Sequence, residues 1–494
     1  MGRPVNWRER LPVIARCEAE LSGSERTKAL SLAKEFIAQS RHREERFYFE
    51  PYARLGVADT QFVFIGDASE IPLLARPDTN PLEYRLSILA GEGDLVIIGG
   101  QRNHDFENYL EHHLDLGHRN YLQVGQTFQK NGAPVSVRCL KDAGTYASLR
   151  THVEKLGAVT LVPHISTGAI WALARQLGKD IGRSIHVAGP LPTMSILANN
   201  KLWFAQVVRR LFGEDAVPAE VSAFGAAALA ARVHSFGQSC SKLVVKIPDS
   251  AGSKGNFPIS SSEISGMGMK ELHQYLVDLL SKTNGQTHYP LMVQVWEKNV
   301  LINCSTQLWI PHPANGSPVV EGIFEQLLTG PKGCFSGASP TRIPEGWNKK
   351  LAHDALMLGQ VFQELGYFGR CSFDAVISGD DFGSAKLQWI ECNGRWGGVS
   401  VPMTFLNQLF RGLAPPPHVI AHRSKLVLPF RSFSEGLEVL KDLLWHPGDT
   451  EGVIFMTPSG FEEGMSLHFL SLAATIKQAD RQTEEVIQRL TKIH

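Results

Sequence analysis

The residues best suited to chemistry lie between residues 366 and 398, where two β-rich runs flank a turn. SFDAVI (372–377) and KLQWIECN (386–393) are rich in apolar residues, and the GDDFG (379–383) between them is dense in Gly and Asp. These residue types favour a tight reversal between two strands. The segment therefore predicts a β-hairpin.

The predicted hairpin gathers polar side chains on one face. Because side chains alternate along a strand, Glu391, Asn393 and Arg395 share a face, and a turn in GDDFG brings Asp374 opposite Trp389 on that same face. Two carboxylates, an amide oxygen and a guanidinium then meet in one small volume.

Oxygen ligands of this kind suit a hard cation such as Mg²⁺, which takes one or two carboxylates and completes its shell with water and substrate phosphates. The hairpin therefore indicates a nucleotide site. An amphipathic hairpin whose charged face meets water is the alternative.

A second segment, KLVVKIPDSAGSKGNFPI (242–259), combines a strand that ends at Lys246 with a glycine-rich loop over residues 250–256. Glycines let the backbone approach an anion, and Ser253 and Lys254 add polar groups that can cradle phosphates. The G-x-x-x-x-G-K-[ST] spacing of a Walker loop is absent. A plain hairpin turn is the alternative here.

GYFGRCSFDAV and IECNGRWGG together resemble the nucleotide-metal segment of the ATP-grasp superfamily. The resemblance implies that Asp374, Glu391 and Asn393 hold Mg²⁺, or Mn²⁺ in its place. It also implies a catalytic role for Arg395, which would face the transferred phosphate or the acyl group.

The K-x-P-x-x-x-G-S-x-G pattern that starts at Lys246 resembles the mobile phosphate-covering loop of ATP-grasp ligases. By this resemblance Lys246 lies on the α and β phosphates of ATP, and the loop closes over the γ phosphate with Gly252, Ser253 and Lys254. Lys246 and Lys254 are assigned to catalysis as well. The N-K dipeptide ending at Lys201 is similar to the family's helix start near the phosphates.

MVQVWEKNVLINCSTQLWI (292–310) is similar to the family's adenine-binding strands and is expected to form a strand pair. The resemblance assigns Gln294, Val295 and Trp296 to the hinge that binds the base. Glu297 is then expected near the ribose or the base.

Composition limits the function further. The 494 residues contain 49 Lys plus Arg and 49 Asp plus Glu, so no bulk charge indicates nucleic acid or a membrane surface. Seven scattered cysteines with no C-x-x-C pair indicate a reducing compartment. We expect a cytoplasmic protein with small-molecule substrates, no nucleic-acid partner and no membrane partner.

The order of predicted elements gives an α/β and α+β multidomain fold. Residues 1–55 are predicted as a helical segment and 413–494 as a small C-terminal α+β domain. The resemblance to the ATP-grasp superfamily implies that 56–198 form a Rossmann-like pre-ATP-grasp domain and 199–412 the ATP-grasp module. In the second region, β-rich runs such as TQFVFIG and GDLVIIGG alternate with helical ones, which predicts a parallel sheet. The G-x-G-x-x-G spacing of a dinucleotide site is absent.

One strand-to-helix junction in this region, VPHISTG (162–168), leaves two interpretations open. His164, Ser166 and Thr167 lie where an anion can bind at a helix N-terminus. Alternatively, Ser166 or Thr167 caps the helix.

Together these features predict an ATP-dependent carboxylate-amine ligase that forms an amide or peptide bond through an acyl phosphate. Within the superfamily, the layout resembles the peptide ligases of pheganomycin biosynthesis. The substrates would be a carboxylate and an amine or peptide, and the charged N-terminal helices would serve a homodimer. Carboxylation, phosphotransfer and a non-catalytic regulatory module remain alternatives.

Overall fold

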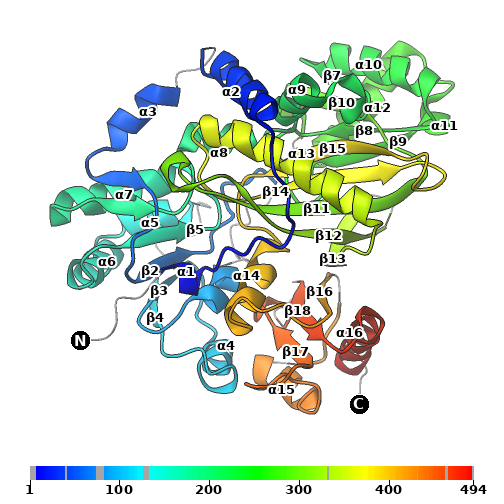
Figure 1. Ribbon diagram of the computed structural model, residues 1–494. Helices are drawn as coiled ribbons and strands as arrows, with labels where there is room; N and C mark the ends of the chain where they lie inside the picture. Colours follow the sequence, from blue (N-terminus) through cyan, green and yellow to red (C-terminus); the bar gives the residue numbers. More distant parts are fainter. Residues whose placement is uncertain are drawn as a thin grey trace.

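A computed structural model gives the fold of the chain as a mixed α/β protein with three sheets of six, four and eight strands (Figure 1). None of the helices within the described parts of the chain is long and apolar enough to cross a membrane. The structure describes residues 7–38, 42–73, 83–125, 133–283, 285–330, 333–424, 426–430, 432–461 and 466–491.

The six-stranded sheet is parallel throughout and confirms the predicted alternation of strands and helices. Its strands follow the order β1-β6-β5-β2-β3-β4. They are β1 (Ala53–Leu55), β2 (Phe62–Ile65), β3 (Leu95–Ile98), β4 (Asn120–Gln123), β5 (Thr160–Pro163) and β6 (Ile185–Val187).

Both faces of this sheet are buried. Along β2, Val63 and Ile65 join one apolar cluster, while Phe62 and Phe64 join another. This follows from the period of two along a strand and explains why the strand is a continuous apolar run. The helices that cover the first cluster include α5 (Val135–Lys141), α6 (Ala143–Lys155) and α7 (Gly168–Ile181).

The four-stranded sheet is antiparallel and has the order β7-β10-β8-β9. It consists of β7 (Glu220–Ala223), β8 (Lys242–Lys246), β9 (Asn256–Ser260) and β10 (Leu291–Val295). Helices α10 (Ala226–Ser239) and α12 (Met269–Ser281) pack together over it. The chain enters this region through α9 (Lys201–Phe212).

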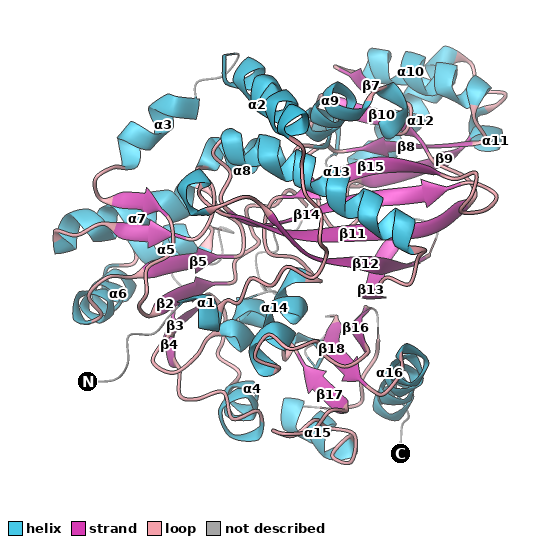
Figure 2. Cartoon of the chain, viewed as in Figure 1, coloured by secondary structure: helices cyan, strands magenta, loops and turns pink. Residues whose placement is uncertain are grey.

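The eight-stranded sheet has the order β15-β14-β11-β12-β13-β16-β18-β17 and lies beside the smaller sheet (Figure 2). The last three strands, which belong to the predicted C-terminal domain, continue the same sheet; the domain boundaries stay a prediction. The strands are β11 (Val300–Ile310), β12 (Val319–Thr329), β13 (Cys334–Pro340), β14 (Gly369–Ser378), β15 (Lys386–Asn393), β16 (His418–Arg423), β17 (Gly452–Phe455) and β18 (Leu467–Leu472).

Helix α13 (Glu345–Glu364) packs on this large sheet, and α2 (Gly23–Ala38) packs on α13. The N-terminal segment is thereby attached to the central part of the molecule. Other helical segments are α1 (Trp7–Arg10), α3 (His42–Phe49), η1 (Glu83–Leu89), α4 (His104–Asn108), η2 (Tyr109–His113), α8 (Pro192–Ala198), α11 (Ser261–Ile264), α14 (Ser400–Leu409), α15 (Phe433–Val439) and α16 (Ile476–Thr491), with single turns at η4 (Glu214–Ala216), η5 (Gly285–Thr287), η6 (Pro313–Asn315) and η7 (Ser459–Phe461).

Two strands form within residues 291–310, as predicted, but the expectation that they pair with each other is wrong. Strand β10 belongs to the small sheet and β11 to the large one, so the chain passes between two sheets here instead of reversing. Asn299, between β10 and β11, has a φ of 50°, a left-handed conformation that changes the direction of the chain.

A buried ion pair ties the N-terminal segment to the large sheet. Arg370 on β14 pairs with Glu321 on β12, and both side chains are almost completely inaccessible to solvent. The Arg370 guanidinium also donates to the carbonyl of Pro12 at 3.3 Å, and Glu321 accepts from the backbone N–H of Ile14 at 3.2 Å.

Replacing Glu321 with Gln should lower the free energy of unfolding by about 3 kcal/mol or more, because a buried guanidinium loses its counter-charge. Urea denaturation followed by circular dichroism measures this change. Glu345→Gln, in an exposed ion pair with Lys349, is the matched control and should leave the free energy of unfolding nearly unchanged. A loss at Glu321 no larger than in the control would contradict the structural role.

Candidate active site

The β14–β15 hairpin forms as predicted, but its register differs. Asp374 lies opposite Glu391, and Trp389 lies opposite Ala375. The prediction of Asp374 opposite Trp389 is therefore wrong. A bulge leaves Ile390 as an extra residue in β15, and this one-residue insertion turns Asp374 and Glu391 to the same face of the sheet.

Asp374 accepts hydrogen bonds from two neighbouring strands. The Ser305 hydroxyl on β11 donates to Oδ1 at 2.6 Å, and the Asn393 amide donates to Oδ2 at 3.0 Å. Arg395 in turn donates to Asn393 Oδ1 at 2.6 Å and to Asn199 Oδ1. The predicted carboxylate, amide and guanidinium thus form one connected group.

Glu391 joins this group to the start of helix α9. Its Oε2 lies 2.8 Å from Nζ of Lys201, whose side chain is 6% exposed. The same ammonium donates to the carbonyl of Ser250 at 2.6 Å. Asn200 caps α9 by accepting from the N–H of Trp203 at 3.1 Å, which fixes where Lys201 begins the helix.

Lys246 ends β8 beside the same carboxylates and is 7% exposed. Its ammonium donates to Gln294 Oε1 at 2.5 Å, and Gln294 donates to Glu220 at 2.9 Å. Glu220 is paired with Arg209 at 3.1 Å. The chain of contacts holds the Lys246 ammonium at the mouth of the glycine-rich loop.

That loop folds back toward the large sheet. Gly252 and Ser253 adopt left-handed conformations with φ of 62° and 59°. The Ser253 hydroxyl then donates to the carbonyl of Gly333 at 3.1 Å, next to β13. A side chain at Gly255 would collide with Ser250, so the loop needs glycine there.

A cleft of about 620 Å³ runs across these elements. This volume is typical of a small-molecule site. Lys201 does not line the cleft itself, but its ammonium contacts Glu391, which does. All the other predicted site residues line the cleft directly, namely Lys246, Gly252, Ser253, Lys254, Gln294, Val295, Trp296, Glu297, Asp374, Glu391, Asn393 and Arg395. Their individual roles remain predictions.

At the junction after β5, Thr167 caps helix α7 by accepting from the N–H of Ile170. Ser166 is buried and donates to the carbonyl of Pro190 at 2.6 Å. His164 lines the cleft, and its backbone carbonyl accepts from the N–H of Trp396 at 3.0 Å. The capping interpretation is therefore confirmed for Thr167, and this junction fixes the loop after β15.

Sequence reasoning missed several residues that support or line the cleft. Ser305 and Asn199 orient Asp374 and Arg395, as described above. Asn199 directly precedes the N-K dipeptide formed by Asn200 and Lys201, so its place in the sequence could have identified it as a candidate site residue. Arg85 and His422 also line the cleft, and nothing local in the sequence marks them.

Burial and mutual charge shift the pKa values in this group. Burial, and then the negative charge of Glu391, raise the pKa of Asp374 to about 7. Burial opposes ionisation of Glu391, but the ammonium groups of Lys201 and Lys246 outweigh it and hold the pKa below its usual value. Burial lowers the pKa of Lys246 to about 8.

The donor set fits a hard divalent cation. Asp374 and Glu391 lie side by side, and the carboxamide of Asn393 is hydrogen-bonded to Asp374. Two carboxylates leave room for the water and phosphate ligands that Mg²⁺ retains. In the described ranges there is no group of three or more His, Cys, Asp or Glu residues that would suit an all-protein metal cage.

Comparison with known proteins agrees with this fold. Residues 83–179 match the family model of the pre ATP-grasp domain. Biotin carboxylase from Campylobacter jejuni, solved with β,γ-ATP, is similar in structure, with a TM-score of 0.54 at 11% identity over 87% of this chain and 91% of that one.

Two further solved structures are similar. The biotin carboxylase domain of 2-oxoglutarate carboxylase from Hydrogenobacter thermophilus gives a TM-score of 0.52 at 12% identity, over 87% of this chain and 90% of that one. N5-carboxyaminoimidazole ribonucleotide synthetase from Thermus thermophilus gives a TM-score of 0.51 at 14% identity, over 87% of this chain and 99% of that one. No curated protein sequence matches the chain.

The chain therefore has the fold of the ATP-grasp enzymes. Its pre ATP-grasp region contributes strands and helices of the six-stranded parallel sheet. ATP-grasp enzymes are ATP-dependent, and the solved relatives with this fold include complexes with nucleotide and magnesium.

In the ligand-free protein, Asp374 should take up a proton near pH 7, which carboxyl ¹³C NMR detects. Glu391→Gln should lower this pKa, because it removes the neighbouring negative charge and leaves Lys201 unpaired. Glu297→Gln, elsewhere in the cleft, is the control and should leave it unchanged. An Asp374 that already titrates near 4 in the unsubstituted protein would contradict the electrostatic account.

Proposed function

We propose that the protein is an ATP-dependent ligase that activates a carboxylate as an acyl phosphate and joins it to an amine, releasing ADP and phosphate. One observation carries the proposal. The Asp374–Glu391–Asn393–Arg395 group and the glycine-rich loop after Lys246 face one cleft in a chain with the ATP-grasp fold.

The chemistry follows from the poor reactivity of a carboxylate, whose leaving group would be an oxide. A carboxylate oxygen bonds to the γ phosphorus of ATP while the bond from that phosphorus to the ADP oxygen breaks. The amine nitrogen then bonds to the acyl carbon, the bond from that carbon to the phosphate oxygen breaks, and phosphate leaves. The amine proton passes to solvent or to the departing phosphate.

The proposed metal ligands are Asp374, Glu391 and Asn393. Mg²⁺ bound there would neutralise charge on the phosphate oxygens. Ser305 holds Asp374 in place, and Lys201 holds Glu391, so both carboxylates are oriented before any ligand binds.

Cationic side chains supply the remaining stabilisation. Lys246, with Lys254 on the loop, binds the phosphates of ATP in this proposal. Arg395, fixed by Asn199 and Asn393, stabilises the negative charge that develops on the acyl oxygen when the amine attacks.

The loop over residues 250–256 excludes water from the acyl phosphate, which would otherwise hydrolyse.

The base would lie against Gln294, Val295 and Trp296, with Glu297 near the ribose or the base. Trp296 already stacks beneath the Lys242 ammonium at 4.0 Å, so its ring is held at the cleft edge. Among the ATP-grasp enzymes, we propose that the protein is most similar to the peptide ligases of pheganomycin biosynthesis.

Carboxylation is the second candidate, because the similar solved structures are carboxylases and a carboxyaminoimidazole ribonucleotide synthetase. The Hydrogenobacter thermophilus domain was solved with MgADP, ADP and bicarbonate, as a dimer. Bicarbonate would replace the organic acid in the same activation step. A homodimer in the cytoplasm is part of our proposal in either case.

Incubation with ATP, Mg²⁺ and panels of acids and amines should release ADP only when an acid is present, and an amine should accelerate the release. Glu391→Gln should reduce turnover by at least about 100-fold, since it removes a proposed metal ligand and the partner of Lys201. Exposed Glu345→Gln is the matched control.

Coupled ADP and pyrophosphate assays separate the outcomes. Release of AMP and pyrophosphate would refute the acyl phosphate route. Turnover driven by bicarbonate and no organic acid would favour carboxylation, and ATP binding without any substrate-dependent turnover would favour the regulatory alternative.

The affinity for ADP should fall as the pH rises through about 8, because Lys246 loses its positive charge there. Calorimetric titration between about pH 7 and 9 measures the fall. Lys246→Arg should remove this dependence, since arginine stays protonated throughout the range. A fall of the same size in the Lys246→Arg variant would exclude Lys246 as its cause.

A further inference from the structure

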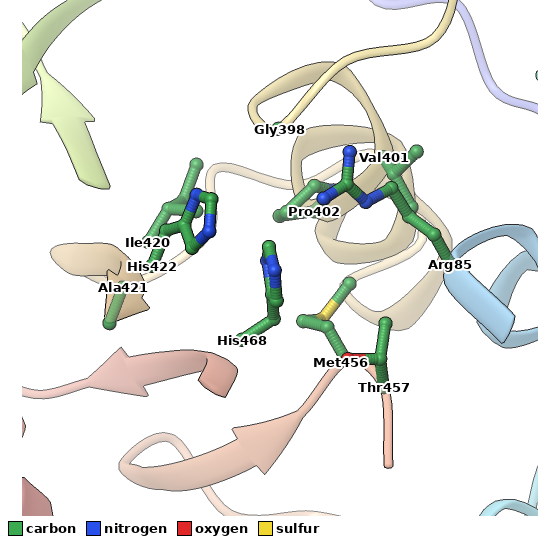
Figure 3. A pocket seen from close by; sticks show the side chains of 10 residues that line it. All are labelled: Arg85, Gly398, Val401, Pro402, Ile420, Ala421, His422, Met456, Thr457 and His468. Carbon is green, nitrogen blue, oxygen red and sulfur yellow. The ribbon is translucent and has the colours of Figure 1, made fainter. Parts of the chain in front are cut away.

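A small cavity opens beside the active-site cleft, at the junction of η1 with β16 and β18 (Figure 3). Arg85, Gly398, His422 and His468 line both the cavity and the cleft. Its volume of about 10 Å³ is about that needed for one water molecule, so it can receive a single oxygen atom of a ligand that lies in the cleft.

The cavity carries one positive charge. Figure 3 shows the Arg85 guanidinium and the His468 ring directed into the same space, with His422 beyond it. Among the described residues, no acidic side chain lines the cavity, and no hydrogen bond or ion pair engages the Arg85 guanidinium. A largely buried cation without a counter-ion is costly, so the site favours an anion.

The two histidines add polar N–H groups and no further charge. Their rings face each other across β16 and β18 and stack with centroids 4.0 Å apart. Burial and then Arg85 lower the pKa of His422 to about 3, and burial, His422 and Arg85 lower that of His468. Both rings are therefore neutral, and the cavity matches an anion of single charge.

A carboxylate fits these groups better than a phosphate. Its charge equals that of one guanidinium, and its planar pair of oxygens matches the fork of N–H donors on arginine. The other lining residues are largely apolar, namely Val401, Pro402, Ile420, Ala421 and Met456. Arg85, His422 and His468 also line the cleft, so they are the polar groups that a carboxylate at the mouth of the cavity meets.

The cavity and the residues around Asp374 line the same cleft but belong to different elements. In the strand order, β16 lies four strands from β14, which carries Asp374. Arg85 and Arg395 are separate guanidinium groups whose charges interact across this cleft. Two carboxylates of one substrate can therefore pair with different arginines, one beside the cavity and one beside Asp374.

We propose that Arg85, with the N–H groups of His422 and His468, binds a second, unreacted carboxylate of a substrate. This inference rests on the proposed ligase function and narrows its substrates to molecules with a carboxylate remote from the reacting group. Such a carboxylate can belong to a diacid or to an amino acid that supplies the amine.

Anion binding tests this directly and needs no turnover. Sodium acetate, as the smallest probe, is titrated into the full-length protein with and without MgADP while the histidine ¹H–¹³C NMR signals are followed. Single His→Gln substitutions assign the signals of His422 and His468. We expect saturable shifts at both histidines.

Arg85→Gln should weaken acetate binding by about tenfold or more, and Arg85→Lys should weaken it less. Arg423→Gln is the matched control, because Arg423 adjoins His422 but its guanidinium is engaged by Ser336 and Glu484. The control should bind acetate within about twofold of the unsubstituted protein. Thermal melting verifies that each variant is folded.

Competition identifies the source of the carboxylate. Glutarate that displaces acetate more strongly than glycine indicates a diacid, and the reverse indicates an amino acid. Absence of saturable shifts, preference for inorganic phosphate, or unchanged binding in both Arg85 variants would overturn the proposal. If the site binds acetate but no acid drives ADP release, the ligase function fails while the anion site stands.

Discussion

The ion pair between the buried Lys201 and the partly buried Glu391 is the contact on which the site depends. It joins the first residue of α9 to β15, and through the Ser250 carbonyl it also reaches the glycine-rich loop. A carboxylate in this largely buried position is costly to ionise alone, so its ionised form requires the nearby lysines. The pair thereby keeps Glu391 charged beside Asp374 and connects β15 to α9 and to the glycine-rich loop.

The same charges give the two neighbouring carboxylates of the cleft opposite pKa shifts. Glu391 stays ionised, while burial and the charge of Glu391 raise the pKa of Asp374 to about 7, so near neutral pH Asp374 carries only part of a negative charge in the ligand-free protein. A divalent cation would relieve that repulsion. Arg85, on η1, lines the same cleft, and within the described residues no acidic side chain pairs with it. In our proposal it binds a carboxylate that does not react.

Sequence patterns predicted the parallel sheet, the hairpin and the glycine-rich loop because each depends on local alternation or local turn chemistry. The bulge at Ile390 was missed because a one-residue insertion has no local signature, although it places Glu391, and not Trp389, opposite Asp374. The assignment of β10 and β11 to different sheets was missed for a similar reason. Arg85 and His422 come together only through long-range packing, which no spacing in the sequence records.

The most direct test is a crystal structure with Mn²⁺ and a non-hydrolysable ATP analogue, with anomalous scattering used to locate the metal. The account predicts an anomalous peak bounded by Asp374, Glu391 and Asn393, with the phosphates beneath the loop over residues 250–256. A nucleotide bound elsewhere, or a metal peak remote from both carboxylates, would contradict it.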